Sequence, residues 1–151
     1  MTEAASELVI TRIFDAPREL VYRAFVDPDE LAQWFGPVGW SVPRDSVSVD
    51  ARVGGHQVFT MVNDADPNQT SPVRAVFTEV VENELLVGTE DVDMSGGAST
   101  EKFFVRLEFH DEGGKTRLVL RQGPYSPENE SGARIGWESS FTKLDALLGH
   151  A

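Results

Sequence analysis

Residues 132–150, GARIGWESSFTKLDALLGH, decide the fold of this chain. The large apolar side chains in this stretch recur at helical spacing, so they lie along one face of an amphipathic helix. They are Trp137, Phe141, Leu144 and Leu148. Gly136 stands directly before Trp137, although glycine inside a helix costs about 1 kcal/mol relative to alanine. We expect its missing side chain to allow either a close approach of the helix to a sheet or a space beside Trp137.

The ends of this helix are marked in the sequence. Ser126 is a suitable N-cap, Pro127 fits the first helical position, and Gly149 fits the stop. We therefore predict one long helix over residues 126–148. Gly132 lies one turn before Gly136 and extends the same thin face.

A strand and two short helices are predicted near the N-terminus. Residues 7–14, ELVITRIF, are mostly β-branched and apolar and predict a first strand. Asp15 and Pro17 predict a capped start for the first short helix. Asp27 predicts the start of the second, and Glu30 is placed to complete a capping box with it.

Six further strands are predicted between the short helices and the long one, because the apolar period changes from helical to alternating. They are residues 42–51, 56–63, 73–81, 84–90, 101–110 and 116–122. Gly54-Gly55 and Gly113-Gly114 predict tight hairpin turns. Residues 64–72 and 91–100 predict longer loops.

This order of elements predicts an α+β fold. A curved antiparallel sheet of about seven strands, one before the two short helices and six after them, wraps around the long C-terminal helix. Only that helix is long enough to cover one face of such a sheet. The length of 151 residues fits a single domain over residues 1–151.

Charge and composition exclude several function classes. Acidic residues outnumber basic ones 25 to 13, and the net charge of -12 repels phosphate backbones and anionic membranes. We therefore expect no nucleic-acid partner and no membrane insertion. The chain has no cysteine, which excludes disulfides and thiolate metal sites. Because no apolar run approaches the ~20 residues of a membrane span and the acidic N-terminus lacks a secretion signal, we expect a cytoplasmic protein.

A set of motifs spread over almost the whole chain carries a family resemblance. They are Arg12 through Pro17, Val21, Asp27-Pro28, Leu31, Trp34 through Pro37, Val53 through Gly55, Thr78 through Val80, and Gly136-Trp137 with Phe141, Leu144 and Leu148. In this order they resemble the START-like (SRPBCC, birch-pollen-allergen-like) superfamily of helix-grip proteins. Within it the chain is similar to bacterial proteins related to the C-terminal domain of the activator of heat shock protein 90 ATPase.

The resemblance implies a cavity between the curved sheet and the C-terminal helix that holds a hydrophobic or amphipathic small molecule. It implies no assigned reaction, and we expect no cofactor. Two alternatives stay open: an interaction module that modulates a chaperone ATPase, and a cyclase- or hydrolase-type enzyme that uses cavity carboxylates. Dimers are common among such proteins, so a homodimer is a further expectation.

The expected cavity lining follows from strand parity and from the helix stripe. Phe59 shares a strand face with Met61, and Phe77 shares one with Glu79. The apolar candidates are Trp40, Phe59, Met61, Phe77, Leu118, Leu120, Trp137 and Phe141, with Gly136 beside them on the helix. The alternative is that these residues are ordinary core.

Two positions on the strand over residues 84–90 are more discriminating. The family pattern places Gly88 and Glu90 on the inward face, where relatives often carry bulky residues. Gly88 would then enlarge the cavity, and Glu90 would supply a polar anchor with a raised pKa. The alternative, which the rarity of buried carboxylates favours, is that the strand ends at Gly88 and Glu90 is solvated in a loop. Glu79 is a similar candidate, although an ion pair with Arg74 or Arg121 is the simpler expectation.

Other candidate sites are weaker. The histidines, at positions 56, 110 and 150, have no triad spacing, which argues against nucleophilic catalysis. Asp91, Asp93 and Ser95 match the opening of a calcium loop, but Lys102 stands where the loop needs a bidentate glutamate, so we expect no metal. Residues 34–40, WFGPVGW, predict either a lid or docking patch at the cavity mouth or a structural plug.

Overall fold

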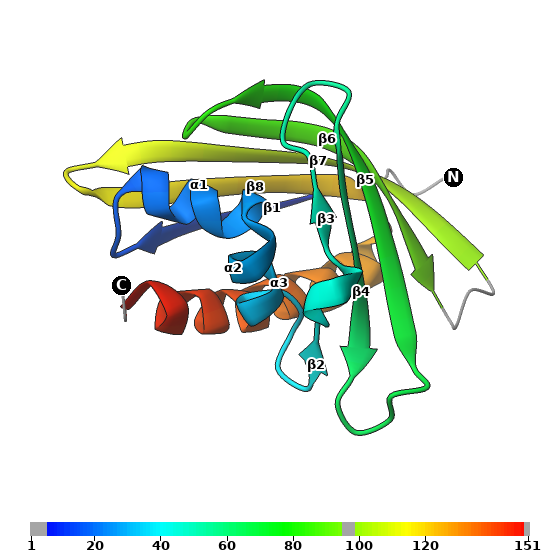
Figure 1. The fold of residues 1–151 in the computed structure, drawn as a ribbon. Helices are drawn as coiled ribbons and strands as arrows, with labels where there is room; N and C mark the ends of the chain where they lie inside the picture. Colours follow the sequence, from blue (N-terminus) through cyan, green and yellow to red (C-terminus); the bar gives the residue numbers. More distant parts are fainter. Residues whose placement is uncertain (1–5, 95–98, 150–151) are drawn as a thin grey trace.

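The computed structural model describes residues 6–94 and 99–149, and Figure 1 shows the fold. Strand β1 (Ser6–Phe14) leads into the short helices α1 (Arg18–Val26) and α2 (Pro28–Trp34). The remaining elements are β2 (Trp40–Ser41), the 3-10 turn η1 (Arg44–Ser46), β3 (Ser48–Val49), β4 (His56–Asn63), β5 (Thr70–Val81), β6 (Leu85–Met94), β7 (Ser99–Glu112), β8 (Lys115–Tyr125) and α3 (Pro127–Gly149).

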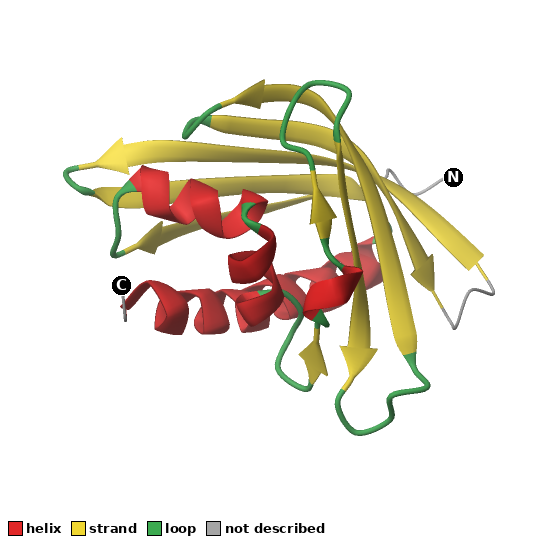
Figure 2. Ribbon diagram, viewed as in Figure 1, coloured by secondary structure: helices red, strands yellow, loops and turns green. Residues whose placement is uncertain are grey.

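The strands form one curled antiparallel sheet in the order β1-β8-β7-β6-β5-β4-β2, and the short β3 also pairs with β4. The N-terminal strand therefore lies beside the last strand of the chain. All three helices lie on the concave side of the sheet, with α1 on β7 and β8 and α2 against α3 (Figure 2). This arrangement confirms the predicted α+β helix-grip fold.

The apolar stripe of α3 is confirmed as the centre of the core. Phe141 and Leu144 are fully buried and Leu148 is 7% exposed. The Phe141 ring meets the Phe14 ring of β1 edge-on, with centroids 5.4 Å apart. Fully burying such a side chain stabilises the fold by roughly 1.5–3 kcal/mol. Trp137, one turn earlier, is only partly buried because it borders the cavity described below.

Local signals at helix and hairpin ends are mostly confirmed. The backbone N–H of Asn129 donates to Ser126 Oγ at 3.3 Å, which caps α3. Gly113 and Gly114 both have positive φ, as the two-residue turn between β7 and β8 requires. None of the helices in the described ranges has the length and hydrophobicity that crossing a membrane requires.

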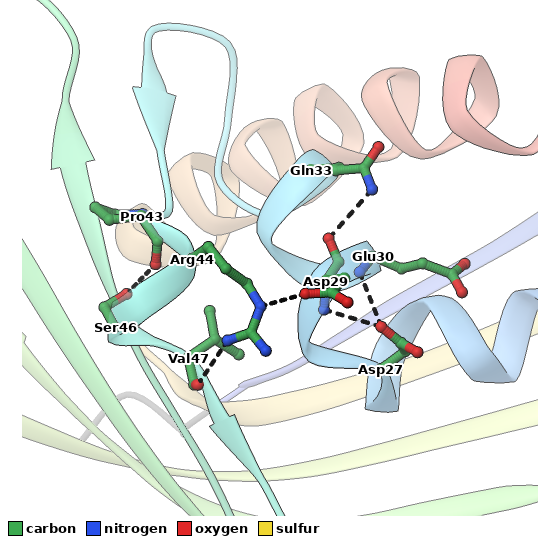
Figure 3. A network of polar contacts seen from close by, with 8 residues as sticks. All are labelled: Asp27, Asp29, Glu30, Gln33, Pro43, Arg44, Ser46 and Val47. Carbon is green, nitrogen blue, oxygen red and sulfur yellow. Dashed lines mark hydrogen bonds and ion pairs between the residues drawn. The ribbon is translucent and has the colours of Figure 1, made fainter.

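The predicted caps of the two short helices were right at one position only. Asp27 accepts from the backbone N–H groups of Asp29 and Glu30, at 2.9 and 3.2 Å (Figure 3). The reciprocal half of the capping box is wrong, because the Glu30 carboxylate pairs with Arg23 at 2.7 Å. The predicted cap at Asp15 is also wrong, since α1 begins after Pro17 without a side-chain cap.

Residues 42–51 do not form the predicted single strand, because side-chain bonds bend this segment into η1 between two short strands. Ser46 Oγ donates to the Pro43 carbonyl at 2.7 Å and accepts from the Thr60 N–H at 3.2 Å. Arg44 bonds the Asp29 carboxylate of α2 and the Val47 carbonyl, which holds the turn against α2 (Figure 3).

The two predicted loops are shorter than expected. β5 already begins at Thr70, β6 continues to Met94, and β7 begins at Ser99, while residues 95–98 lie outside the described ranges. Cross-strand pairing explains the extension of β6, because Asp91 lies opposite Lys102 and bonds it at 2.9 Å. Opposite charges facing each other stabilise strand pairs although the individual residues favour loops.

Candidate functional site

The concave face of the sheet and the first half of α3 enclose a cavity of about 760 Å³. This volume lies within the ~300–1,000 Å³ typical of small-molecule sites. Alternate residues of β4, β5, β6 and β8 face it, as strand geometry requires. The sheet residues are Phe59, Met61, Ser71, Val73, Glu90, Val92, Phe103, Gln122, Pro124 and Tyr125. The others are Phe35, Pro37, Ser126, Glu128, Asn129, Gly132, Ala133, Gly136, Trp137 and Ser140.

The inner wall of the cavity is apolar and largely aromatic. The Phe35 ring, directly after α2, lies 4.5 Å from the Phe59 ring and 5.4 Å from the Trp137 ring, centroid to centroid. The Phe103 ring lies 4.8 Å from that of Tyr125 on the far side. At the N-terminal end of α3 the lining residues are exposed, so the cavity opens to solvent there.

A polar network centred on Gln122 crosses the cavity lining. Gln122 is only 4% exposed, and its Oε1 accepts from Trp137 Nε1 and from the Tyr125 hydroxyl, both at 2.7 Å. Its Nε2 donates to Glu90 Oε1. The network joins β6, β8 and α3. It uses both lone pairs of the Gln122 amide oxygen and one of the two N–H groups of its amide nitrogen.

The orientation of the Gln122 amide follows from chemistry. An indole N–H can only donate, so the Gln122 oxygen must face Trp137. The amide nitrogen therefore faces Glu90, where a carboxyl oxygen accepts from it whether Glu90 is protonated or ionised. This hydrogen bond orients the Glu90 carboxyl toward Gln122 beside the cavity.

Burial changes the acidity of two members of this network. Desolvation raises the pKa of Glu90 from 4.5 to about 7, and the hydrogen bond from Gln122 opposes this rise. The pKa of Tyr125 is also raised, mainly by burial and further by the nearby Glu90 charge. A carboxyl that titrates near neutral pH inside a cavity marks a candidate functional group.

The expectation that Glu90 is solvated in a loop is wrong. β6 continues past Gly88 to Met94, so Glu90 keeps the inward parity of Leu86. Ala75 and Phe103 are its partners in register on the neighbouring strands. The rarity of buried carboxylates misled the prediction, because Gln122 supplies a partner from a distant strand.

Gly136 and Gly132 form a thin roof over the cavity. A Cβ atom built on either glycine would have no contact within 4 Å, and both residues line the cavity. Close approach of the helix to the sheet is therefore not the reason for Gly136. The missing side chain leaves space beside Trp137, which is the other of the two explanations expected from the sequence.

Gly88, in contrast, does not line the cavity, so the expectation that it enlarges the space is wrong. A Cβ atom on Gly88 would lie 2.4 Å from the carbonyl oxygen of Val76 on β5. Gly88 lies opposite a register shift between Phe77 and Glu79, where the two strands approach closely.

We predict that Gly88→Ala lowers the free energy of unfolding by about 2 kcal/mol, because the added methyl group must displace backbone. Urea denaturation measures the change. Gly132→Ala is the matched control, since its Cβ meets open space and it raises helix propensity. Equal stability of the two variants would contradict the steric role of Gly88.

Glu79 lies outside the cavity, against the prediction that it shares a face with Phe77. The register pairs Phe77 with Gly88 and Glu79 with Val87, so Thr78 is an extra residue that reverses the alternation. The Glu79 side chain is 58% exposed and lies 3.9 Å from Arg106. An ion pair was expected, but neither Arg74 nor Arg121 is this partner, and Arg121 bonds Glu7 instead.

Apart from Gly88 and Glu79, the predicted lining residues fall into three sets. Five of the predictions do line the cavity, namely Phe59, Met61, Glu90, Gly136 and Trp137, and their role in binding stays a prediction. Phe77, Leu118, Leu120 and Phe141 are buried in the core instead. Trp40 borders neither, and its carbonyl accepts from Lys143 Nζ at 3.1 Å.

Several important lining residues were missed. Gln122 and Tyr125 come from the end of β8, beyond or at the edge of the strand predicted over residues 116–122. Phe35 was assigned to a lid or plug, and Val73 and Phe103 were not among the predicted lining residues. Alternation along β7 carries a usable signal for Phe103, whereas nothing local distinguishes Gln122 from an exposed strand glutamine.

The WFGPVGW segment acts as a plug at its first residue. Trp34 is fully buried, and its Nε1 donates to the Ala24 carbonyl at 2.8 Å. Its ring packs against Phe25 and Phe141. The segment then contributes Phe35 and Pro37 to the cavity lining, so it closes the core on one side and shapes the cavity on the other.

The weaker candidates stay apart from the cavity. Within the described ranges no group of three or more metal-binding side chains occurs, and the middle of the calcium-like loop lies outside those ranges. His56 does reach a serine, with Nε2 2.7 Å from Ser48 Oγ, and His110 bonds Glu108 at 2.9 Å. Ser48 lies on β3, which pairs with the β4 strand of His56, and Glu108 lies on the same strand as His110. The sequence spacing typical of catalytic triads does not reveal such pairs.

Comparison with solved structures places this architecture among known bacterial proteins. A Chromobacterium violaceum protein superposes with a TM-score of 0.81 at 26% identity, over 95% of this chain and 97% of its own. The AHSA1 protein of Silicibacter pomeroyi superposes with a TM-score of 0.82 at 27% identity, over 95% of this chain and 98% of its own. No curated protein matches significantly.

The family model described as "Activator of Hsp90 ATPase homolog 1-like protein" matches residues 15–149. The match extends from the start of the short helices to the end of α3, and it includes every residue around the cavity. This chain therefore belongs to the family of activator of Hsp90 ATPase homolog 1-like proteins.

Proposed function

We propose that this protein binds a hydrophobic or amphipathic small molecule in the cavity between the sheet and α3. The observation that carries the proposal is a concave space of about 760 Å³ between the sheet and α3, lined mainly by apolar and aromatic side chains. Protein interiors normally pack to the density of organic crystals, so a void of this size needs a reason. A bound apolar molecule supplies one.

The arrangement of the lining residues favours a ligand-binding site over a packing defect. Aromatic rings in mutual contact fix the apolar wall, and a hydrogen-bonded amide fixes the polar side. The two helix glycines keep the roof thin where larger residues would fill the space. Apolar walls with a few placed polar groups are typical of small-molecule sites.

The enzyme alternative loses one of the two groups on which it rested. It required Glu79 and Glu90 to converge in the cavity, whereas Glu79 lies on the outer face of the sheet. A single carboxyl with a raised pKa is suited to binding a polar group of a ligand. We therefore rank binding above catalysis.

Titration with the neutral fluorescent probe N-phenyl-1-naphthylamine tests this function. We expect saturable binding at one site per chain, with energy transfer from Trp137, which lines the cavity. Native mass spectrometry of protein purified from its own host would then identify a retained ligand by mass. Absence of saturable probe binding would contradict the proposal.

An assay of the ATPase rate of Hsp90 distinguishes the interaction-module alternative from ligand binding. If the protein raises the ATPase rate of Hsp90 and a bound probe leaves that rate unchanged, the surface rather than the cavity carries the activity. Inhibition of the effect by the probe would instead connect the two.

A further inference from the structure

The hydrogen bonds around Glu90 leave one of its oxygens available to a ligand. Oε1 accepts from Gln122, and no second bond to this carboxyl occurs within the described ranges. Every fully buried polar side-chain atom there has a partner, so Oε2 is accessible, and the space beside Glu90 is the cavity. When Glu90 is ionised, a ligand group at this point must donate a hydrogen bond to be satisfied.

The rest of the polar lining strengthens this requirement. Both lone-pair positions of Gln122 Oε1 are used by Trp137 and Tyr125, and the Ser140 hydroxyl donates to the Gly136 carbonyl at 3.0 Å. Among the described lining residues, Glu90 is therefore the carboxyl group away from the exposed mouth, and it keeps unused acceptor capacity.

The charges around the cavity favour a cation over an anion. Among its lining residues in the described ranges there is no lysine, arginine or histidine, whereas Glu128 stands at the exposed mouth. A carboxylate ligand would therefore face Glu90 without a counter-ion. The net charge of -12 adds a field that attracts cations to the mouth.

The aromatic lining adds a second feature that suits a cation. Trp137, Tyr125 and Phe103 all border the cavity, and Trp137 and Tyr125 bond the same amide oxygen as parts of the Glu90 network. Faces of aromatic rings attract ammonium groups, most strongly where water is excluded. An alcohol would satisfy Glu90 but would gain nothing from the rings or from the negative field.

Resting on the proposed function, we infer that the cavity selects a ligand with an apolar body and a protonated amine, whose ammonium group donates to Glu90. The body lies along the wall formed by Phe35, Phe59 and Met61. The raised pKa of Glu90 agrees with this assignment, because a nearby cation stabilises the ionised carboxylate and recovers the cost of burying it.

Three probes with a ten-carbon chain test the headgroup: decylamine, decanol and decanoate. Each is titrated by calorimetry, decanol below its solubility limit and the two charged probes below their critical micelle concentrations. For the native protein at about pH 8 we expect decylamine to bind at least tenfold more tightly than either of the others. Its affinity should rise between about pH 6 and about pH 8 as Glu90 ionises. Tyr125 and Glu128 are the other titratable side chains of the lining, and burial raises the pKa of Tyr125 further above that interval.

Glu90→Gln keeps an acceptor for Gln122 but removes the charge. We expect this variant to bind decanol as the native protein does and to lose the preference for decylamine and its dependence on pH. Glu79→Gln is the matched control, because it removes the same charge from the outer face. It should keep the native preference.

The outcomes separate this inference from the proposed function. Equal or tighter binding of decanol or decanoate by the native protein would overturn the amine assignment, as would an unchanged preference in Glu90→Gln. Binding of N-phenyl-1-naphthylamine without binding of decylamine would also overturn it while leaving the ligand-binding function in place. Failure of all four probes to bind would overturn both.

Discussion

Gly136→Leu is expected to weaken binding of N-phenyl-1-naphthylamine strongly while the protein stays folded. A Cβ atom at this position meets nothing within 4 Å, so the backbone accepts a side chain, and the leucine then occupies the cavity beside Trp137. We expect the affinity to fall about a hundredfold, which corresponds to roughly 2.8 kcal/mol. Fluorescence titration measures the loss.

Stability distinguishes a blocked cavity from a damaged helix. Leucine is a better helix former than glycine by nearly 1 kcal/mol, so the free energy of unfolding should stay constant or rise. Ala146→Leu is the matched control, because Ala146 is exposed on the same helix and its replacement leaves the cavity open. Unfolding of Gly136→Leu would show that this glycine is needed for packing, and native affinity would show that the probe binds elsewhere.

Glu90→Gln is expected to raise the stability of the protein by about 3 kcal/mol at pH 8 and to change it little at pH 4.5. Burial raises the pKa of this carboxyl from 4.5 to about 7 in the folded state. Between these values the folded protein holds a proton that the unfolded chain has released. The native free energy of unfolding therefore falls as pH rises through this window, and it levels off above about pH 7.

The difference in the free energy of unfolding between the native protein and Glu90→Gln reports the contribution of Glu90, because both proteins share all other carboxylates. Glutamine does not titrate and keeps an acceptor for Gln122. The curve of unfolding free energy against pH for Glu90→Gln therefore lacks the fall that Glu90 causes in the native protein. Urea denaturation at several pH values measures both curves. Glu79→Gln serves as the control, since an exposed pair at 3.9 Å contributes at most about 1 kcal/mol. Parallel curves for the native protein and Glu90→Gln would show that folding does not shift the pKa of Glu90.

The pH dependence of stability and the preference for an amine depend on the same carboxyl, that of Glu90. Ionised Glu90 destabilises the empty protein near neutral pH, and an ammonium ligand would remove that cost. A ligand of this kind should therefore stabilise the native protein more strongly at pH 8 than at pH 5, while the variant shows no such difference.

The prediction of the site failed where strands depart from regular alternation. Parity placed Phe59 and Met61 correctly, because β4 is regular along its length. The same reasoning misplaced Glu79, because one extra residue in β5 reverses the faces. Nothing in the local pattern around Thr78 announces this bulge, which depends on how β5 pairs with β6.

The α3 stripe, its cap, the Gly113-Gly114 turn and most of the strand periods could be predicted from the sequence, since each depends on residues within a few positions of one another. Which side chains meet at the cavity depends on the tertiary structure. Glu90, Gln122, Tyr125 and Trp137 come from three elements, and they converge because β6, β7 and β8 pair in one register beneath α3. Register is set by hydrogen bonds between strands far apart in the chain, so a buried carboxyl and its partner cannot be recognised until the sheet has formed.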